Sequence, residues 1–368
     1  MSARRKIWNI AWRLVLCAAL LTWIFHSIFV NEGRLEAQRD GVAWDSLARA
    51  EQWRIAWTHG PAALWQTLRL VEPFAMALSV VLMGSTVLLG VIRWRMVLKV
   101  QGLELPFSRA GEISLIAHFF NSFLLGSTGG DLLKAYYAAR ETHHLKTEAV
   151  TTVFVDRLIG LFAMLLFASL MMLPNMGLLA SHHRLWTVGA LVLGMLGACA
   201  VLVYLAFWGG VTRGFPQARE WLRKLPKGEH LERSLEACRR FGKEPAFLLK
   251  AMLLSMALNA LCVLQLLVLA RGLGMTIPTL PLFFIVPSII CIAALPITPS
   301  GLGVRENLFV LLLAVPHIAA PETQSLSLSL LAYAGSLFWS IVGGVVYLSI
   351  KQSQHLDEVT DADAANGG

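Results

Sequence analysis

The apolar residues of this chain gather into long runs that are separated by short polar connections. A helix that crosses a bilayer needs about 20 mostly apolar residues. Six runs meet this length, at residues 10–30, 73–92, 150–173, 186–208, 247–270 and 327–350. Two further runs, 108–140 and 280–314, are long but are interrupted by Gly and Pro. The pattern predicts an all-α, polytopic membrane protein.

The composition agrees with a bilayer as the solvent for much of the surface. Hydrophobic residues make up 56% of the chain and charged residues 15%, whereas a soluble domain carries about 25% charged residues. The net charge of +8 would suggest nucleic acid as a partner of a soluble protein. Here the basic residues lie in the connections between apolar runs, as the positive-inside rule expects, so we expect no nucleic-acid partner.

The charges of the connections also predict a topology. Basic residues before the first span place the N-terminus in the cytoplasm, and they precede a retained helix rather than a cleaved signal peptide. The connection 209–250 holds ten Lys and Arg against five Glu, so it should be cytoplasmic. All connections satisfy the rule if 108–140 and 280–314 are re-entrant hairpins that enter from opposite faces. That arrangement resembles the inverted repeat of many transporters.

This topology predicts a single membrane domain with one large loop and a C-terminal tail. We expect one integral membrane domain at 1–352, with a basic cytoplasmic loop at 209–246 and a disordered acidic tail at 353–368. The segment 31–72 carries five Arg, six acidic residues and several Trp, so it has no positive bias. We expect it to form helices along the extracytoplasmic interface, where Trp rings are favoured. Both termini are then cytoplasmic.

The first broken run carries polar side chains around a glycine-rich turn. Glycine permits a sharp turn, and irregular backbone at membrane depth must be buried in protein or line a wet cavity. Candidate substrate ligands in this run are Asn121, Gly129, Gly130, Asp131, Lys134 and Tyr137. The helical spacing puts Lys134 and Tyr137 on roughly the same face as Asp131. The alternative is an ordinary loop in which Asp131 only caps the following helix.

The span 150–173 begins with two ionisable residues, Asp156 and Arg157. Adjacent residues on a helix do not face each other, so each should pair elsewhere. A charge stranded in lipid costs at least a few kcal/mol, which makes both residues candidate ligands. The alternative is a pair at the membrane edge whose side chains reach for water.

The second broken run contains two prolines and two glycines within eight residues, so a straight helix cannot continue through it. Its candidate ligands are Ser300, Gly301, Gly303, Arg305 and Glu306. Arg305 opposes the dipole at the start of the next helix, which suggests a bound anion or an internal carboxylate as its partner. Arginine matches phosphate with two hydrogen bonds. The alternative is a salt bridge from Arg305 to Asp131 or Asp156.

Signatures of soluble chemistry are missing from the sequence. It contains no Walker, GxSxG, HExxH or dinucleotide-binding pattern in a fitting context, and its histidines lack metal-ligand spacing. We therefore expect no cofactor, no metal site and no catalytic residue. An enzyme stays an open alternative to a transporter.

Three segments together resemble the lysylphosphatidylglycerol synthase transmembrane family, which is also described as flippase-like. They read GSTGGDLLKAYYAAR at 126–140, TEAVTTVFVDRLIGL at 147–161 and LPITPSGLGVRENLFVLL at 295–312. Their order and separation match the family pattern over about residues 70 to 350. Leu125 departs from that pattern, because many relatives carry proline before the glycine turn.

The resemblance implies a bacterial inner-membrane protein that translocates a phospholipid or a lipid-linked anionic substrate. No soluble aminoacyltransferase domain follows the last span in this sequence, so we expect the translocating part rather than the synthase. Two alternatives stay open. One is an enzyme that acts on lipid-linked glycans, and the other is an accessory protein that binds an envelope enzyme or forms a homo-oligomer.

Overall fold

The described part of the structure is built from helices and the turns that join them. The computed structural model describes most of the chain from residue 40 to residue 366 and scattered positions between 22 and 38. The stretches 124–128, 142–145, 209–227, 296–297 and 299–300 lie outside the described part. The described residues form helices and turns and no strand, which confirms the all-α fold class.

Thirteen helices carry the argument below, and we give their bounds here in chain order. The α-helices are α2 (Arg49–Arg69), α3 (Pro73–Val100), α4 (Phe107–Phe123), α5 (Gly129–Glu141), α6 (Lys146–Met172), α7 (Met176–Ser181), α8 (His183–Trp208), α11 (Gly228–Gly242), α12 (Pro245–Gly272), α13 (Thr279–Ala293), α14 (Val304–Leu313) and α15 (Glu322–Asn366). A 3-10 helix, Leu173–Asn175, joins α6 to α7.

Five helical segments are long and apolar enough to cross a membrane. They are Pro73–Val100, Lys146–Ser181, His183–Trp208, Pro245–Gly272 and Glu322–Ser349. These segments coincide with the last five predicted spans, so the multi-pass membrane architecture is confirmed. The first predicted span, 10–30, lies largely outside the described residues.

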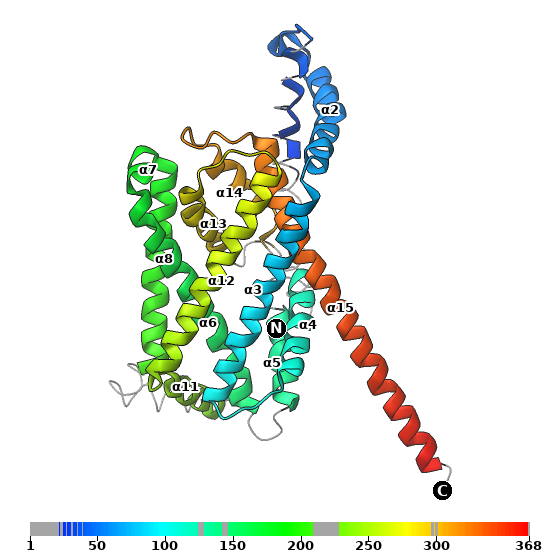
Figure 1. Cartoon of the computed structure of the whole chain (residues 1–368), viewed down its shortest axis with the longest axis vertical. Helices are drawn as coiled ribbons and strands as arrows, with labels where there is room; N and C mark the ends of the chain where they lie inside the picture. Colours follow the sequence, from blue (N-terminus) through cyan, green and yellow to red (C-terminus); the bar gives the residue numbers. More distant parts are fainter. Residues whose placement is uncertain are drawn as a thin grey trace. The chain divides into compact units, whose positions relative to one another are not determined.

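The chain divides into two compact units. Unit 1 consists of Met1–Met83, Leu161–Cys199 and Met256–Gly335, and unit 2 consists of Gly84–Gly160, Ala200–Ser255 and Ser336–Gly368. Each of the five long helical segments contributes residues to both units. The helices of the two broken runs do not: α4 and α5 pair side by side within unit 2, and α13 and α14 pair within unit 1 (Figure 1).

The core of unit 1 is a large apolar cluster around α13. Phe284 and Ile289 of α13 are fully buried there with Phe309 of α14, Leu269 of α12 and Leu328 of α15. α13 is apolar on all sides, which suits a helix that other helices surround. The short helices α13 and α14 are therefore held mainly by burial of their side chains.

The core of unit 2 packs α3, α4, α5 and α6 together. Trp94 and Leu98 of α3 are buried there with Ile113 of α4, Ala138 of α5 and Val153 of α6. The small Ala138 lets the helix backbones approach closely, as is common between helices in membranes. This packing fixes the rotation of α5 and α6 and so decides which of their polar side chains meet.

Several element boundaries differ from the predicted ones. The predicted span 73–92 continues as α3 to Val100, because backbone hydrogen bonding does not stop where charged side chains begin. A turn follows the helix, and Gly102 in that turn has a φ of +75°. The predicted basic loop 209–246 contains the amphipathic helix α11. α15 is drawn as helix as far as Asn366, and the disorder expected of the acidic tail 353–368 stays a prediction.

The tryptophan-rich segment 31–72 contains α2, whose two faces differ. Ala56, Gly60 and Leu64 are buried at helical spacing, whereas Trp53, Trp57 and Trp65 are exposed. Gly60 is required by close packing, because a Cβ atom there would lie 2.4 Å from the ring of Phe29. Trp53 and Trp57 lie one helical turn apart and so share one side of α2.

Candidate functional site

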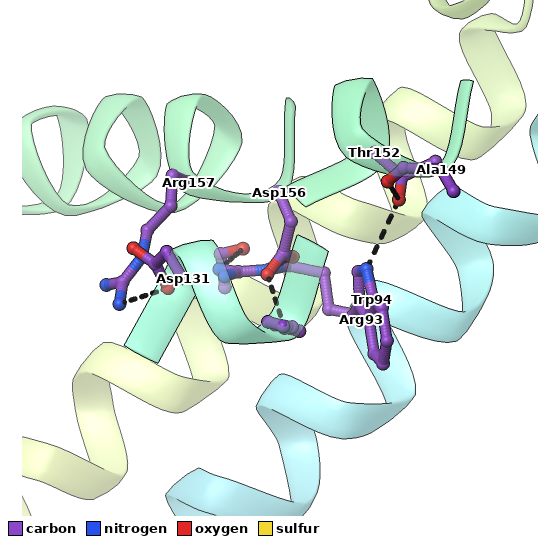
Figure 2. A network of polar contacts seen from close by, with 9 residues as sticks. Arg93, Trp94, Asp131, Ala149, Thr152, Asp156 and Arg157 are labelled. Atoms are coloured by element: carbon purple, nitrogen blue, oxygen red, sulfur yellow. Dashed lines mark hydrogen bonds and ion pairs between the residues drawn. The ribbon is translucent and has the colours of Figure 1, made fainter. Parts of the chain in front are cut away.

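A buried ion network in unit 2 joins α3, α5 and α6. The Arg93 Nε atom donates to Asp156 Oδ1 at 2.8 Å, and Lys134 Nζ lies 3.4 Å from Asp156 Oδ2. Arg93 also donates from Nη1 to the hydroxyl of Ser255 in α12 at 3.0 Å. The Asp156 side chain is only 8% exposed. Asp156 therefore balances two buried cations that come from different helices. Figure 2 shows Asp156 beside Arg93.

Trp94 lines the same network from α3. Its ring centroid lies 4.2 Å from Lys134 Nζ, a cation–π contact that helps to hold the ammonium group away from water. The indole N–H of Trp94 donates to the hydroxyl of Thr152 at 3.4 Å, and that hydroxyl donates to the Ala149 carbonyl (Figure 2). The ammonium group thus has an anion on one side and an aromatic ring on another.

A second ion pair, Asp131–Arg157, lies beside this network and is open at the surface of unit 2. Arg157 of α6 donates from Nε to Asp131 Oδ2 at 2.5 Å and from Nη2 to Oδ1 at 2.8 Å (Figure 2). The Arg157 side chain is 55% exposed. Exposed apolar side chains on the same two helices are Leu132, Tyr136, Val150 and Phe154. A guanidinium group is thus presented within an apolar surface.

The start of α5 is built by a close approach to α4. The Gly130 N–H donates to Asn121 Oδ1 at 2.8 Å, which satisfies one of the amide groups that a helix leaves free at its first turn. A Cβ atom at residue 130 would lie 1.9 Å from the Ala117 carbonyl oxygen, so only glycine fits there. Asn121 and Gly130 therefore position Asp131 in the first turn of α5.

The second predicted cluster lies in unit 1, at the start of α14. Gly301 and Gly303 have φ values of +70° and +82°, the left-handed region that favours glycine. The Gly303 N–H donates to Glu306 Oε2 at 2.6 Å, and Arg305 Nε donates to Glu306 Oε1 at 3.1 Å. Glu306 is fully buried. The carboxylate therefore stabilises both the helix start and the arginine.

Arg305 has two further contacts on α15. Its Nε donates to the Ser329 hydroxyl at 3.2 Å, and its guanidinium carbon lies 4.6 Å from the ring centroid of Tyr333. The predicted need for a partner is thus met by Glu306, the next residue in the chain, and by α15. Neither Asp131 nor Asp156 is needed as the partner, because those carboxylates bind Arg157, Arg93 and Lys134.

Replacement of Glu306 by glutamine is expected to lower the stability by about 1.5 kcal/mol, the lower range for a hydrogen bond to a charged group. Glutamine can still accept the Gly303 N–H, but it cannot balance the charge of Arg305. The readout is the midpoint of heat-induced loss of the monodisperse peak in detergent. Glu51→Gln, which breaks an exposed ion pair with Arg54, should leave the midpoint nearly unchanged. An equal effect of both variants would contradict this role.

The predicted ligands fall into three groups. Asp131, Lys134, Asp156 and Arg157 are brought together in unit 2, and Asn121, Gly129 and Gly130 build the turn beside them. Gly301, Gly303, Arg305 and Glu306 form the cluster in unit 1, and Ser300 lies outside the described residues. Tyr137 packs against the unit 2 core and the ring of Tyr136.

Sequence reasoning did not identify Arg93, Trp94 and Ser255 as members of the network. Arg93 lies near the end of a predicted span, where basic residues ordinarily mark the cytoplasmic side. The sequence feature that could have identified Arg93 is its position directly after the apolar residues Val91 and Ile92 of the span. Among the described residues, no three His, Cys, Asp or Glu side chains gather as a metal site.

The membrane region of this chain is similar to a known protein family and to membrane proteins of two archaea. The family described as "Lysylphosphatidylglycerol synthase TM region" matches residues 50–344. A UPF0104 membrane protein of Methanothermobacter thermautotrophicus is 24% identical over 317 residues, which cover 80% of this chain and 89% of that protein. A UPF0104 membrane protein of Pyrococcus horikoshii is 24% identical over 298 residues, 75% of this chain and 87% of that protein. The chain therefore belongs to the lysylphosphatidylglycerol synthase transmembrane-region family.

Proposed function

We propose that this protein binds a phospholipid or a lipid-linked anionic substrate in the bilayer and translocates it across the inner membrane. The observation that carries the proposal is the combined charge of the buried network in unit 2 and of the Asp131–Arg157 pair beside it. Arg93, Lys134 and Arg157 supply three positive charges, and Asp131 and Asp156 supply two negative ones. One positive charge is left over among apolar helices, where an unbalanced charge is costly. A phosphate would balance it.

Arg157 is the residue best placed to meet that phosphate. Its guanidinium group is more exposed than the other charged groups of the network. An open ion pair exchanges partners at a lower cost than a buried one. We propose that Arg157 turns from Asp131 to the phosphate with a similar two-bond geometry. Asp131 would then be free to attract a cationic group of the same substrate, while the buried Asp156 network keeps its structure.

The two broken runs are proposed to be re-entrant hairpins. α4 and α5 both belong to unit 2, and α13 and α14 both belong to unit 1, whereas each full-length span contributes to both units. A run that crossed the bilayer would be expected to contribute to both units in the same way. This division supports hairpins that return to the side from which they enter, as in transporters built from inverted repeats.

The orientation is also proposed. Basic residues at 93–99 and 209–250 favour a cytoplasmic location for those segments. The N-terminus and the C-terminus would then both be cytoplasmic. The exposed Trp53, Trp57 and Trp65 of α2 would lie along the extracytoplasmic interface, where one side of an indole ring is apolar and the other is wet.

Translocation is tested with the purified full-length protein in liposomes that contain fluorescent phospholipids. Dithionite quenches only the lipids of the outer leaflet, so a protein that moves lipids makes the inner ones quenchable. The panel includes anionic, zwitterionic and aminoacylated head groups, with and without a proton or sodium gradient. We expect at least one phosphate-bearing class to become fully quenchable. If no lipid moves under any gradient, the translocation proposal fails, and enzymatic or accessory roles on lipid-linked glycans take its place.

A further inference from the structure

A cleft of about 370 Å³ lies in unit 2 between the end of α3 and the start of α4. The residues that line it are Arg95, Lys99, Leu103, Glu104, Leu105 and Pro106. It does not include the residues of the ion network described above. Its walls combine two cationic side chains and one carboxylate with apolar groups.

Arg95 is held in place by one hydrogen bond from its Nε atom and by a contact with an aromatic ring. Its Nε donates to the Leu105 carbonyl at 3.2 Å, and its guanidinium carbon lies 5.5 Å from the ring centroid of Phe107. Its two terminal nitrogens have no hydrogen-bond partner among the described residues. A fixed guanidinium group with free terminal N–H groups is suited to a phosphate, because little side-chain freedom is lost on binding.

Lys99 lies one helical turn after Arg95, so the two cations share one side of α3. It is exposed and has no ion-pair partner within the described part of the chain. Glu104 is the one carboxylate among the described residues that line the cleft, so these residues carry two positive charges and one negative charge, a net charge of +1. The local field therefore favours an anion.

The position of the cleft points to the head-group layer. The cleft lies at the end of α3 that carries the charged residues Arg95 and Lys99, after the apolar part of the helix. The exposed ring of Phe107 at the start of α4 lies beside it. Phosphates of lipid head groups occupy this depth in a bilayer, and phosphorylated solutes reach it from the water.

We propose that this cleft is a binding site for a phosphate group, carried by a lipid head group or by a soluble phosphorylated compound. Arg95 binds two phosphate oxygens and Lys99 contributes the second positive charge. Glu104 weakens the binding of a doubly charged phosphate by repulsion and so limits its affinity. The site goes beyond the translocation proposal, since it requires binding only.

The test measures binding to the purified full-length protein in a neutral detergent. One arm titrates inorganic phosphate and glycerol 3-phosphate by calorimetry. The other arm counts bound phosphatidylglycerol against phosphatidylcholine by native mass spectrometry. The variants are Arg95→Gln with Lys99→Gln, Glu104→Gln, and Arg54→Gln on α2 as a control for the loss of an exposed arginine.

The double variant is expected to weaken phosphate binding by about tenfold or more, the effect of losing a charge-assisted hydrogen bond. Glu104→Gln is expected to tighten it several-fold, which a merely damaged cleft would not do, and Arg54→Gln should bind like the wild type. Response in the lipid arm alone identifies a head group as the ligand, and response in the solute arm alone identifies a soluble phosphate. If wild type binds neither probe, or if Glu104→Gln weakens binding, the proposal is wrong. Translocation is read separately, so the two proposals can fail independently.

Discussion

Replacement of Asp156 by asparagine is expected to lower the stability by about 3–5 kcal/mol, the cost of breaking a buried ion pair from one side. Asparagine keeps the shape of the side chain but leaves Arg93 and Lys134 without their shared anion. The other described partners of these cations, Ser255 and the ring of Trp94, carry no net charge. The measurement is the midpoint of heat-induced unfolding in detergent, together with the yield of monodisperse protein.

A second substitution separates this charge effect from simple loss of contacts. In the Asp156→Asn background, Lys134→Met removes one of the two unpaired cations and keeps an apolar chain of similar length. The double variant should therefore be more stable than Asp156→Asn alone. Glu51→Gln is the matched control, because its partner Arg54 is 72% exposed and such pairs contribute about 0–1 kcal/mol. An Asp156→Asn protein as stable as this control would refute the role of Asp156.

Replacement of Gly130 by alanine is expected to separate α5 from α4 and to cost up to about 3 kcal/mol, the upper range for an overpacked core. The added Cβ would lie 1.9 Å from the Ala117 carbonyl oxygen, and backbone cannot move aside as a flexible side chain can. The shift also weakens the bond from the Gly130 N–H to Asn121. Asp131 would then be displaced from Arg157.

Gly111→Ala provides the matched control on α4. A Cβ atom at residue 111 would meet no described neighbour within 4 Å, and alanine is favoured over glycine in a helix by about 1 kcal/mol. We therefore expect Gly111→Ala to be as stable as the wild type or more stable. The two variants are compared by thermal midpoint in the same detergent. Equal midpoints would mean that the approach of α4 to α5 is not constrained by Gly130.

The sequence predicts the helical architecture well because apolar runs of membrane length have few alternatives. Backbone groups in lipid must be bonded internally, so an apolar run such as 247–270 has to be helical. Boundaries are less predictable, because α3 continues past its first charged residues to Val100. The helix α11 was interpreted as part of a loop, since its basic residues dominated its apolar positions.

The sequence predicted which polar residues are candidates, but it did not predict which of them form ion pairs with one another. The prediction that Asp156 and Arg157 pair elsewhere is confirmed, because adjacent helical positions point in different directions. Which helix supplies each partner depends on the rotation of α3 and α5, and that is decided by packing around Trp94 and Ala138. A single sequence does not contain this information in a local pattern.

For Arg305 too, the sequence predicted that a partner is needed but did not identify the partner. Its unfavourable place at a helix start correctly indicated that it needs a partner. The partner is Glu306, which a helical-wheel argument excludes because the two residues are adjacent. The contact is made because Glu306 folds back to the Gly303 N–H at the end of the glycine turn. Local backbone geometry, rather than side-chain spacing, therefore decides this pair.

The measurement that tests translocation through the unit 2 network most directly is the initial rate of lipid movement by Arg157→Gln in the liposome assay. Rates are normalised to folded protein, and Arg54→Gln serves as the control for an exposed arginine. We expect Arg157→Gln to be slower than the wild type by about tenfold or more, since a charge-assisted bond to phosphate is lost, and Arg54→Gln to be unchanged. Movement of the same lipid by Arg157→Gln at the wild-type rate would contradict the account.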